Sequence, residues 1–198
     1  MMRALSFAIV LAAATPASAD ILFGVFAEGH VGGESGKATG GDQVVKDSAF
    51  FAKAPGFLYG FQVGANLLFI NAWIQHDQFT DGDRIATWTQ FGTGVRQQVG
   101  FAGLFAEFGA GAWYGFGTGQ QVTGPYDGGQ VTDKAILLEG RVGAGKHINR
   151  FLDIGLAVPV SWGYFFKSGN GASVTDLSTH YQSVQSELLL FVRGHVGL

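Results

Sequence analysis

Ten ionisable side chains recur on the polar side of a sequence that alternates polar and apolar residues. They are Glu28, His30, Arg96, Glu107, Glu139, Arg141, Asp153, Glu187, Arg193 and His195. An unpaired buried charge is strongly destabilising, and the five carboxylates and three guanidinium groups of this set can neutralise one another. We therefore predict that these side chains form a structural salt-bridge network in the interior of the fold. The alternative is a path for protons or solutes.

Ser183, His30, Asp77 and His180 supply the residue types of a Ser-His-Asp hydrolase near one end of the predicted strands. Strand parity places His30 and Ser183 inward on adjacent strands. No spacing in the chain matches a lipid A deacylase or palmitoyltransferase pattern. We therefore expect no enzymatic activity, and a lipid-modifying enzyme stays an alternative.

Two further patterns concern phosphate and metal binding. Residues 140–146 (GRVGAGK) match the first seven positions of a P-loop, but His147 stands where a Ser or Thr would bind magnesium. Asp77, Asp81 and Asp83 could offer oxygen ligands to Ca²⁺, although Asp-Gly in a short connector is first a turn signal. We predict neither a cofactor nor a bound metal.

The composition restricts the class of protein. The chain has 198 residues, of which 47% are hydrophobic and 14% charged, with 32 glycines and no cysteine. An average soluble domain carries about 25% charged residues and about 7% glycine. The 18 Phe, 5 Tyr and 4 Trp supply too much apolar area for a disordered chain. The lack of cysteine excludes a disulfide scaffold and a thiolate zinc site.

The first 19 residues have the layout of a secretory signal peptide. Arg3 precedes an apolar run, and the small residues of Ala17-Ser18-Ala19 predict cleavage before Asp20. The apolar run is too short to span a bilayer, which needs about 20 residues. The remaining chain has 11 basic and 15 acidic residues, a formal charge of −4. It lacks the basic stripe that nucleic-acid binding requires.

Residues 20–198 alternate with period two, in segments of about ten residues separated by stretches rich in Gly, Asp, Ser and Thr. We expect eight strands, at 21–32, 56–64, 68–78, 85–97, 101–116, 134–146, 151–165 and 181–198. Long connectors follow the first, fifth and seventh segments, and tight ones separate the second from the third, the fourth from the fifth and the sixth from the seventh. Pro159 removes a ladder donor, which predicts a local bulge.

The polar face decides which side of the strands points inward. Alternation alone also fits a soluble β-sandwich or a lipocalin-like barrel with an apolar core. Here the polar face is mostly glycine with one or two ionisable groups per segment, as a narrow lumen would favour. The apolar face carries aromatic residues near the segment ends, as membrane-interface girdles do: Phe57, Tyr59, Tyr114, Phe116, Phe151, Trp162 and Tyr164.

In this pattern the chain resembles the small eight-stranded outer-membrane β-barrel proteins of Gram-negative bacteria, the OmpA/OmpX-like barrels, over residues 20–198. The resemblance implies an all-β, antiparallel, up-and-down transmembrane barrel that contacts outer-membrane lipids as a monomer. It also implies a structural or surface-interaction role through the extracellular loops. Such proteins usually end in an aromatic residue, whereas this chain ends in Leu198.

A short repeat links the two ends of this predicted barrel. Residues 26–32 (FAEGHVG) recur as residues 191–197 (FVRGHVG), and the two segments would be neighbours where the barrel closes. Glu28 and Arg193 then face each other with opposite charge. Chance in a chain rich in Gly and Val explains the repeat equally well.

The long connector after the first strand is the best contact surface for an unidentified extracellular partner. Phe50 and Phe51 are its most distinctive residues, and packing on the barrel rim explains them equally well. The competing interpretations are a narrow solute channel, the lipid-modifying enzyme and a soluble periplasmic β-barrel carrier.

Overall fold

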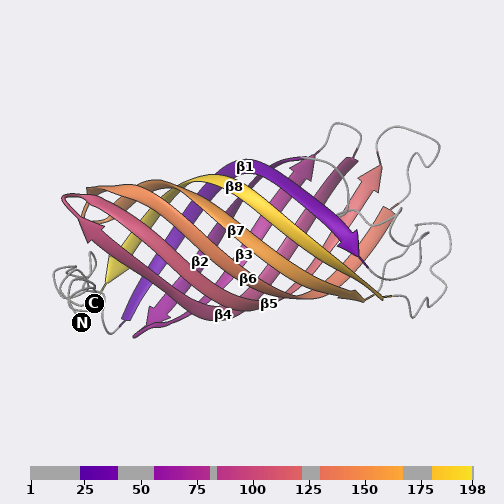
Figure 1. The fold of residues 1–198 in the computed structure, drawn as a ribbon, viewed down its shortest axis with the longest axis horizontal. Coiled ribbons are helices and arrows are strands. Elements are labelled where there is room, and N and C mark those ends of the chain that lie inside the picture. The colour runs from indigo at the N-terminus through magenta and orange to yellow at the C-terminus, as the bar shows by residue number, and fades with distance from the viewer. Residues whose placement is uncertain (1–22, 40–55, 81–83, 122–129, 167–179, 198) are drawn as a thin grey trace, which may run out of the picture.

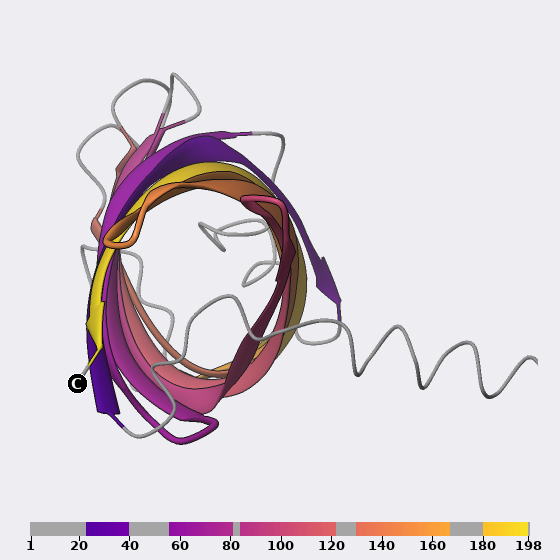
Figure 2. The same ribbon diagram turned by 90° about the vertical axis from the view of Figure 1, so that its left-hand side faces the viewer.

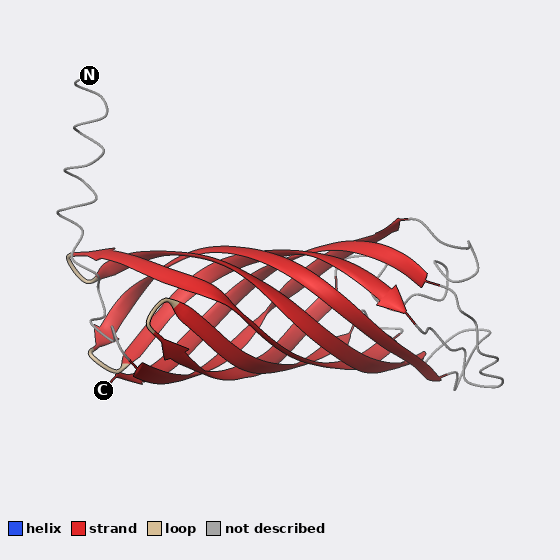
Figure 3. Cartoon of the chain, turned by 90° about the horizontal axis from the view of Figure 1, so that it is seen from below, coloured by secondary structure: helices blue, strands red, loops and turns tan. Residues whose placement is uncertain are grey.

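The chain folds into eight β-strands. The computed structural model describes residues 23–39, 56–80, 84–121, 130–166 and 180–197. The strands are β1 (Phe23–Thr39), β2 (Gly56–Leu67), β3 (Ile70–Thr80), β4 (Arg84–Phe101), β5 (Leu104–Gln121), β6 (Gln130–Asn149), β7 (Leu152–Phe166) and β8 (His180–Gly197). These strands and three two-residue turns make up the whole described part (Figure 3). No helix in the described part is long and apolar enough to cross a membrane.

The sheet closes on itself. Each strand pairs antiparallel with its neighbours in sequence, and β1 also pairs with β8 (Figures 1 and 2). Closure leaves no strand at an exposed sheet edge. The register sets Glu28 opposite Arg193, as expected if the repeated segments are neighbours. The predicted all-β, eight-stranded antiparallel barrel is confirmed.

Three tight turns lie at one end of the barrel, which we call the turn end. They occupy residues 68–69, 102–103 and 150–151. Leu68, Ala102 and Gly103 have φ angles of 56°, 53° and 81°. Positive φ in a two-residue hairpin loop matches the right-handed twist of the strands, and glycine adopts it without strain.

At the opposite end, which we call the loop end, consecutive strands are separated by longer stretches of sequence. These stretches are residues 40–55, 81–83, 122–129 and 167–179, and all of them lie outside the described residues. At the turn end Phe23 pairs with Leu67 and Gly24 with Gly197, so β1 begins and β8 ends there. The predicted asymmetry of short and long connectors therefore coincides with the two ends of the barrel.

Side chains alternate between an exposed apolar outer face and a buried inner face. On the outer face Leu104 is 60% exposed and Val142 59% exposed. On the inner face Glu28 is 1% exposed and Phe191 is fully buried. The predicted assignment of the faces agrees with the structure in every strand.

The inner face contains more aromatic side chains than the glycine-rich pattern suggested. The buried inward-facing rings belong to Phe26, Trp73, Trp88, Phe105, Trp113, Phe165 and Phe191. Trp73 and Trp113 meet edge to face with ring centroids 4.8 Å apart, a favourable aromatic geometry. The rings fill the barrel on both sides of its central charged residues.

Inward glycines make room for these rings. A Cβ atom on Gly64 would lie 2.7 Å from Cζ of Phe26, and one on Gly155 would lie 2.7 Å from Cζ of Phe191. Real Cβ atoms essentially never approach another heavy atom so closely. A carbonyl oxygen of the neighbouring strand would also lie 2.6 Å from each of these two Cβ atoms, so glycine is required at both positions.

This close approach leads to a prediction. Gly155→Ala should lower the free energy of unfolding by about 1–3 kcal/mol, because the added methyl overpacks the site against the carbonyl oxygen of Ala144 and the ring of Phe191. The matched control is Gly140→Ala, since a Cβ at Gly140 meets nothing within 4 Å. Denaturant unfolding of both variants in lipid vesicles measures the difference. Equal losses at the two positions would contradict the account of the inward glycines.

The strands differ from the sequence prediction in length and in one irregularity. β1 continues past Gly32 to Thr39 because its backbone stays paired with β8 as far as Gln182. The predicted bulge at Pro159 is wrong. The register with β6 runs straight through the proline, and a shift occurs instead between His147 and Asn149. On the other side, the pairing of β7 with β8 skips Val158 and Pro159 and resumes in the same register, as the lost ladder donor predicts.

Candidate functional site

Two carboxylates and three guanidinium groups meet at the centre of the barrel. Glu28 on β1 and Glu107 on β5 face Arg96 on β4, Arg141 on β6 and Arg193 on β8. Period-two alternation points all five side chains inward, and barrel closure brings the five strands around them. We call these five residues the central ion cluster.

Two arginines each bridge both carboxylates. Nη2 of Arg193 lies 2.5 Å from Oε2 of Glu28, and Nη1 of Arg193 lies 2.5 Å from Oε2 of Glu107. Nη2 of Arg141 lies 2.9 Å from Oε1 of Glu28, and Nε of Arg141 lies 2.8 Å from Oε1 of Glu107. Charge-assisted hydrogen bonds of this kind are roughly twice as strong as neutral ones. The cluster therefore links β1, β5, β6 and β8 across the lumen.

Arg96 joins the same cluster more loosely. Its Nη1 lies 3.7 Å from Glu28 Oε2, its Nε lies 3.9 Å from Glu107 Oε1, and its Nη2 donates to Oε1 of Gln62 at 3.1 Å. Its guanidinium carbon also lies 5.0 Å from the ring centroid of Trp73. The cluster has three guanidinium groups and only two carboxylates. The cation–π contact with Trp73 and the hydrogen bond to the Gln62 amide stabilise the third guanidinium group, that of Arg96.

An aromatic ring packs against two guanidinium groups of the central ion cluster. Phe191 lies beneath two guanidinium groups, with its centroid 4.7 Å from Cζ of Arg193 and 5.3 Å from Cζ of Arg141. Glu28, Arg141 and Arg193 are all buried, and burial strengthens the electrostatic attraction of the ion pairs and raises the cost of breaking any one of them.

A second polar group lies beside the cluster. His30 Nε2 contacts Asp77 Oδ1 at 2.7 Å, and Gln75 donates to Asp77 Oδ2 at 2.7 Å. His30 Nδ1 lies 4.0 Å from Oε1 of Glu28. His30 therefore connects Asp77 with the central ion cluster.

The Ser-His-Asp arrangement considered from the sequence does not assemble. The register sets Ser183 beside Ala38, eight residues along β1 from His30. At about 3.3 Å per residue this separation is roughly 26 Å. His180 begins β8, and its side chain lies outside the described ones. Strand parity had placed Ser183 and His30 on the same face but could not give their separation along the barrel.

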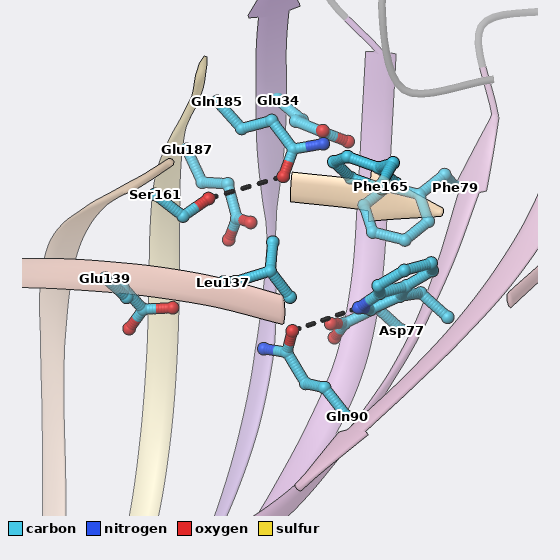
Figure 4. A pocket seen from close by; sticks show the side chains of 11 residues that line it. Glu34, Asp77, Phe79, Gln90, Leu137, Glu139, Ser161, Phe165, Gln185 and Glu187 are labelled. Atoms are coloured by element: carbon cyan, nitrogen blue, oxygen red, sulfur yellow. Dashed lines mark hydrogen bonds between the residues drawn. The ribbon is translucent and has the colours of Figure 1, made fainter. Parts of the chain in front are cut away.

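A recess towards the loop end gathers four carboxylates (Figure 4). Glu34, Asp77, Glu139 and Glu187 line it, and no lysine or arginine does so within the described part of the chain. Its space not filled by atoms is about 370 Å³, part of which is continuous with solvent. Gln90, which accepts a 3.0 Å hydrogen bond from Trp88, and the hydrogen-bonded Ser161–Gln185 pair complete its polar lining.

The ten inward residues do not form the single network that the sequence predicts. Glu139 and Glu187 face the recess, and Asp153 and His195 lie near the turn end. The set is therefore divided along the barrel axis, and only Glu28, Arg96, Glu107, Arg141 and Arg193 form the central ion cluster.

The turn end holds a third polar group, of which the sequence predicts only Asp153 and His195 as inward residues. Asp153 Oδ1 lies 2.7 Å from Nδ1 of His147 and 3.5 Å from Nε2 of His195. In the sequence, His147 stands out only as the residue that breaks the P-loop pattern. Its inward parity with Gly143 and Gly145 was a signal that could have placed it inside.

The P-loop-like stretch lies in a strand, and the other sequence candidates lie at least partly outside the described residues. Residues 140–146 lie within β6, so the P-loop-like stretch is part of a strand. Asp81 and Asp83, the partners of Asp77 in the calcium hypothesis, lie outside the described residues, as do Phe50 and Phe51.

Comparison with known proteins bears on the fold. No protein-family model matches the chain, and a search of curated protein sequences found no match. The crystal structure of Neisserial surface protein A (NspA) is similar with a TM-score of 0.54 at 14% identity, covering 87% of this chain and 96% of that chain.

Two other solved structures are more distant. The outer membrane protein OprG from Pseudomonas aeruginosa has a TM-score of 0.40 at 8% identity, covering 89% of this chain and 96% of its own. Ail, the attachment invasion locus protein of Yersinia pestis, has a TM-score of 0.35 at 8% identity, covering 85% of this chain and 97% of its own. The closed barrel of β1 to β8 and the similarity to Neisserial surface protein A show that the chain has the fold of the small eight-stranded β-barrels, and the resemblance predicted from the sequence is confirmed at the level of the fold.

Proposed function

We propose that this protein is a monomeric outer-membrane β-barrel whose lumen is closed by the central ion cluster and which acts as a structural or surface-interaction protein through its loop end. The observation that carries the proposal is the combination of a closed barrel with an apolar outer face and a charged inner core. Only closed barrels and helices satisfy all backbone hydrogen bonds within a lipid bilayer.

The outer face has the chemistry of a lipid-facing wall. Exposed large apolar side chains occur on every strand, among them Phe61, Ile74, Leu138 and Leu156. Apolar area of this extent in water marks an aggregation hazard or an interaction surface, whereas a bilayer covers it. Phe57, Tyr59, Phe116, Phe151 and Trp162 are exposed on this face near the strand ends, where interfacial aromatic residues are expected.

The inner face supports a closed lumen better than a carrier or a channel. An eight-stranded barrel is just wide enough for side chains to fill it. A carrier of apolar ligands needs a mostly apolar pocket, whereas the recess is lined by four carboxylates. Those carboxylates favour a narrow cation path as the second candidate function. The central ion cluster has one more guanidinium group than carboxylates, and this excess positive charge would disfavour a cation that entered from the recess.

The register keeps Ser183 eight residues along β1 from the level of His30, so this nucleophile and base do not meet, which supports a non-enzymatic role. Interaction through Phe50 and Phe51 with an extracellular partner remains part of the proposal. Lipid A analysis of cells with and without the protein tests the enzymatic alternative, which a changed acylation pattern would favour.

Fractionation combined with gel mobility tests the proposal. The protein should be found in the outer-membrane fraction, and in SDS it should migrate faster before boiling than after, because a closed barrel resists SDS until heated. Recovery in the soluble periplasmic fraction without a mobility shift would contradict it.

A further inference from the structure

Three metal-binding side chains converge at the turn end of the barrel. His147 lies near the end of β6, just before the register shift, Asp153 is the second residue of β7, and His195 lies near the end of β8. One ligand atom from each residue lies within 4.8 Å of the other two. We propose that His147, Asp153 and His195 form a binding site for a divalent transition metal, with Zn²⁺ as the ion that fits best.

One ligand spacing matches that of a zinc site, and the site would have to adjust at another. Zinc binds imidazole nitrogen and carboxylate oxygen at about 2.0–2.2 Å in a tetrahedral arrangement, which sets two ligand atoms roughly 3.3 Å apart. Nε2 of His195 lies 3.5 Å from Oδ1 of Asp153, near this spacing. Nδ1 of His147 lies 2.7 Å from the same oxygen, a hydrogen-bond distance. Zinc binding would replace the proton in that hydrogen bond and widen the contact by roughly 0.6 Å.

The scaffold holds the three ligands firmly. The backbone N–H of His195 donates to the carbonyl of Phe151 at 3.0 Å, and the backbone N–H of His147 donates to the carbonyl of Gly103 at 2.8 Å. The ring of His147 also packs on Phe105, with centroids 4.8 Å apart. The ligands therefore come from strand ends that tight turns fix in place, and pre-positioning of this kind favours metal binding.

Neighbouring polar groups orient the carboxylate. Gln98 Nε2 lies 3.4 Å from Oδ2 of Asp153 and 3.3 Å from Oε2 of Glu107. This amide leaves Oδ1 to face the two histidines, as the outer partners of metal-binding carboxylates do. Arg193, which pairs with Asp153 in the strand register, directs its guanidinium group to Glu28 and Glu107 instead.

The site is open to an aqueous compartment. The side chains of His147 and His195 are 19% and 14% exposed, while that of Asp153 is 1% exposed. An ion can therefore enter from the turn end without crossing the central ion cluster. Three protein ligands leave one tetrahedral position for water, the arrangement typical of accessible zinc sites.

The ligand set selects among metals. Two imidazoles and one carboxylate suit Zn²⁺ and neighbouring transition metals, whereas Ca²⁺ and Mg²⁺ prefer oxygen ligands alone. The proposal therefore differs from the calcium hypothesis for Asp77, Asp81 and Asp83 in both place and chemistry.

Titration of the full chain without a histidine tag, folded in detergent, tests the site. Wild type should bind one Zn²⁺ per chain in competition with a chromophoric chelator. His147→Gln and His195→Gln should each weaken binding by about tenfold or more, since loss of even an outer partner costs roughly 10–100-fold. The matched control is His76→Gln, because His76 lies on β3 and contacts Thr89 at 2.8 Å, away from the turn end. It should leave binding unchanged.

A second readout does not depend on the variants folding. Co²⁺ added to wild type should give the visible d–d absorption of a nitrogen- and oxygen-ligated site, and Zn²⁺ should abolish it. The heat-dependent gel shift shows whether each variant has folded. Wild-type Zn²⁺ binding no tighter than that of folded His147→Gln and His195→Gln, or no Co²⁺ absorption in wild type, would overturn the proposal.

Discussion

Glu28→Gln is expected to lower the free energy of unfolding by about 3–5 kcal/mol, the range for breaking a buried ion pair by removing one partner. Glu28 is 1% exposed and accepts hydrogen bonds from both Arg141 and Arg193. The substitution would leave three guanidinium groups sharing the single carboxylate of Glu107. Denaturant unfolding in lipid vesicles measures the loss.

Glu187→Gln is the control for this prediction. Glu187 also points inward, but it shares the recess with three other carboxylates. Removing one of four like charges should not destabilise the barrel, because it relieves repulsion. An equal loss for Glu28→Gln and Glu187→Gln would show that the central ion cluster has no special role in stability.

Phe191→Ala is expected to be similarly costly, at about 3–5 kcal/mol. The ring is fully buried, packs 6.4 Å from the ring of Phe105 and lies against the guanidinium groups of Arg141 and Arg193. The substitution removes a large apolar side chain and leaves a cavity next to desolvated charges.

Leu190→Ala, one position earlier on the same strand, is the control for Phe191→Ala. Leu190 points outward and is 46% exposed, so truncation opens no internal cavity and the loss should be clearly smaller. The same unfolding measurement compares the two variants. A larger loss at Leu190 than at Phe191 would mean that the faces of β8 are assigned the wrong way round.

Alternation in the sequence was sufficient to predict the fold and the two faces. Period two separates Glu28 from Ala27 and Phe191 from Leu190 whatever the register is. The exceptions in the last strand, Leu189 and Phe191, also follow from parity, and both are buried inside. The tight connectors predicted which strand ends share the turn end. They also restrict the register of the strands that they join, because a two-residue hairpin loop leaves few choices of register.

The site could be predicted only in part, because parity does not give height along the barrel axis. Glu139 and Arg141 share a face and are two residues apart, yet Glu139 lines the recess while Arg141 joins the central ion cluster. Which acids meet which arginines depends on the register around the closed barrel. The sequence also did not predict that β1 extends to Thr39 and β5 to Gln121. These extensions have no apolar pattern, and only backbone pairing with the neighbouring strands continues them.

Electrical recording across a planar lipid bilayer tests the central claim, that the lumen is closed, most directly. Purified wild-type protein inserted in the bilayer should give no stepwise conductance, while a known open porin in the same bilayer reports normal insertion conditions. Reproducible unit steps from wild type would contradict a closed lumen, and cation selectivity of those steps would favour the path that begins at the carboxylate-lined recess.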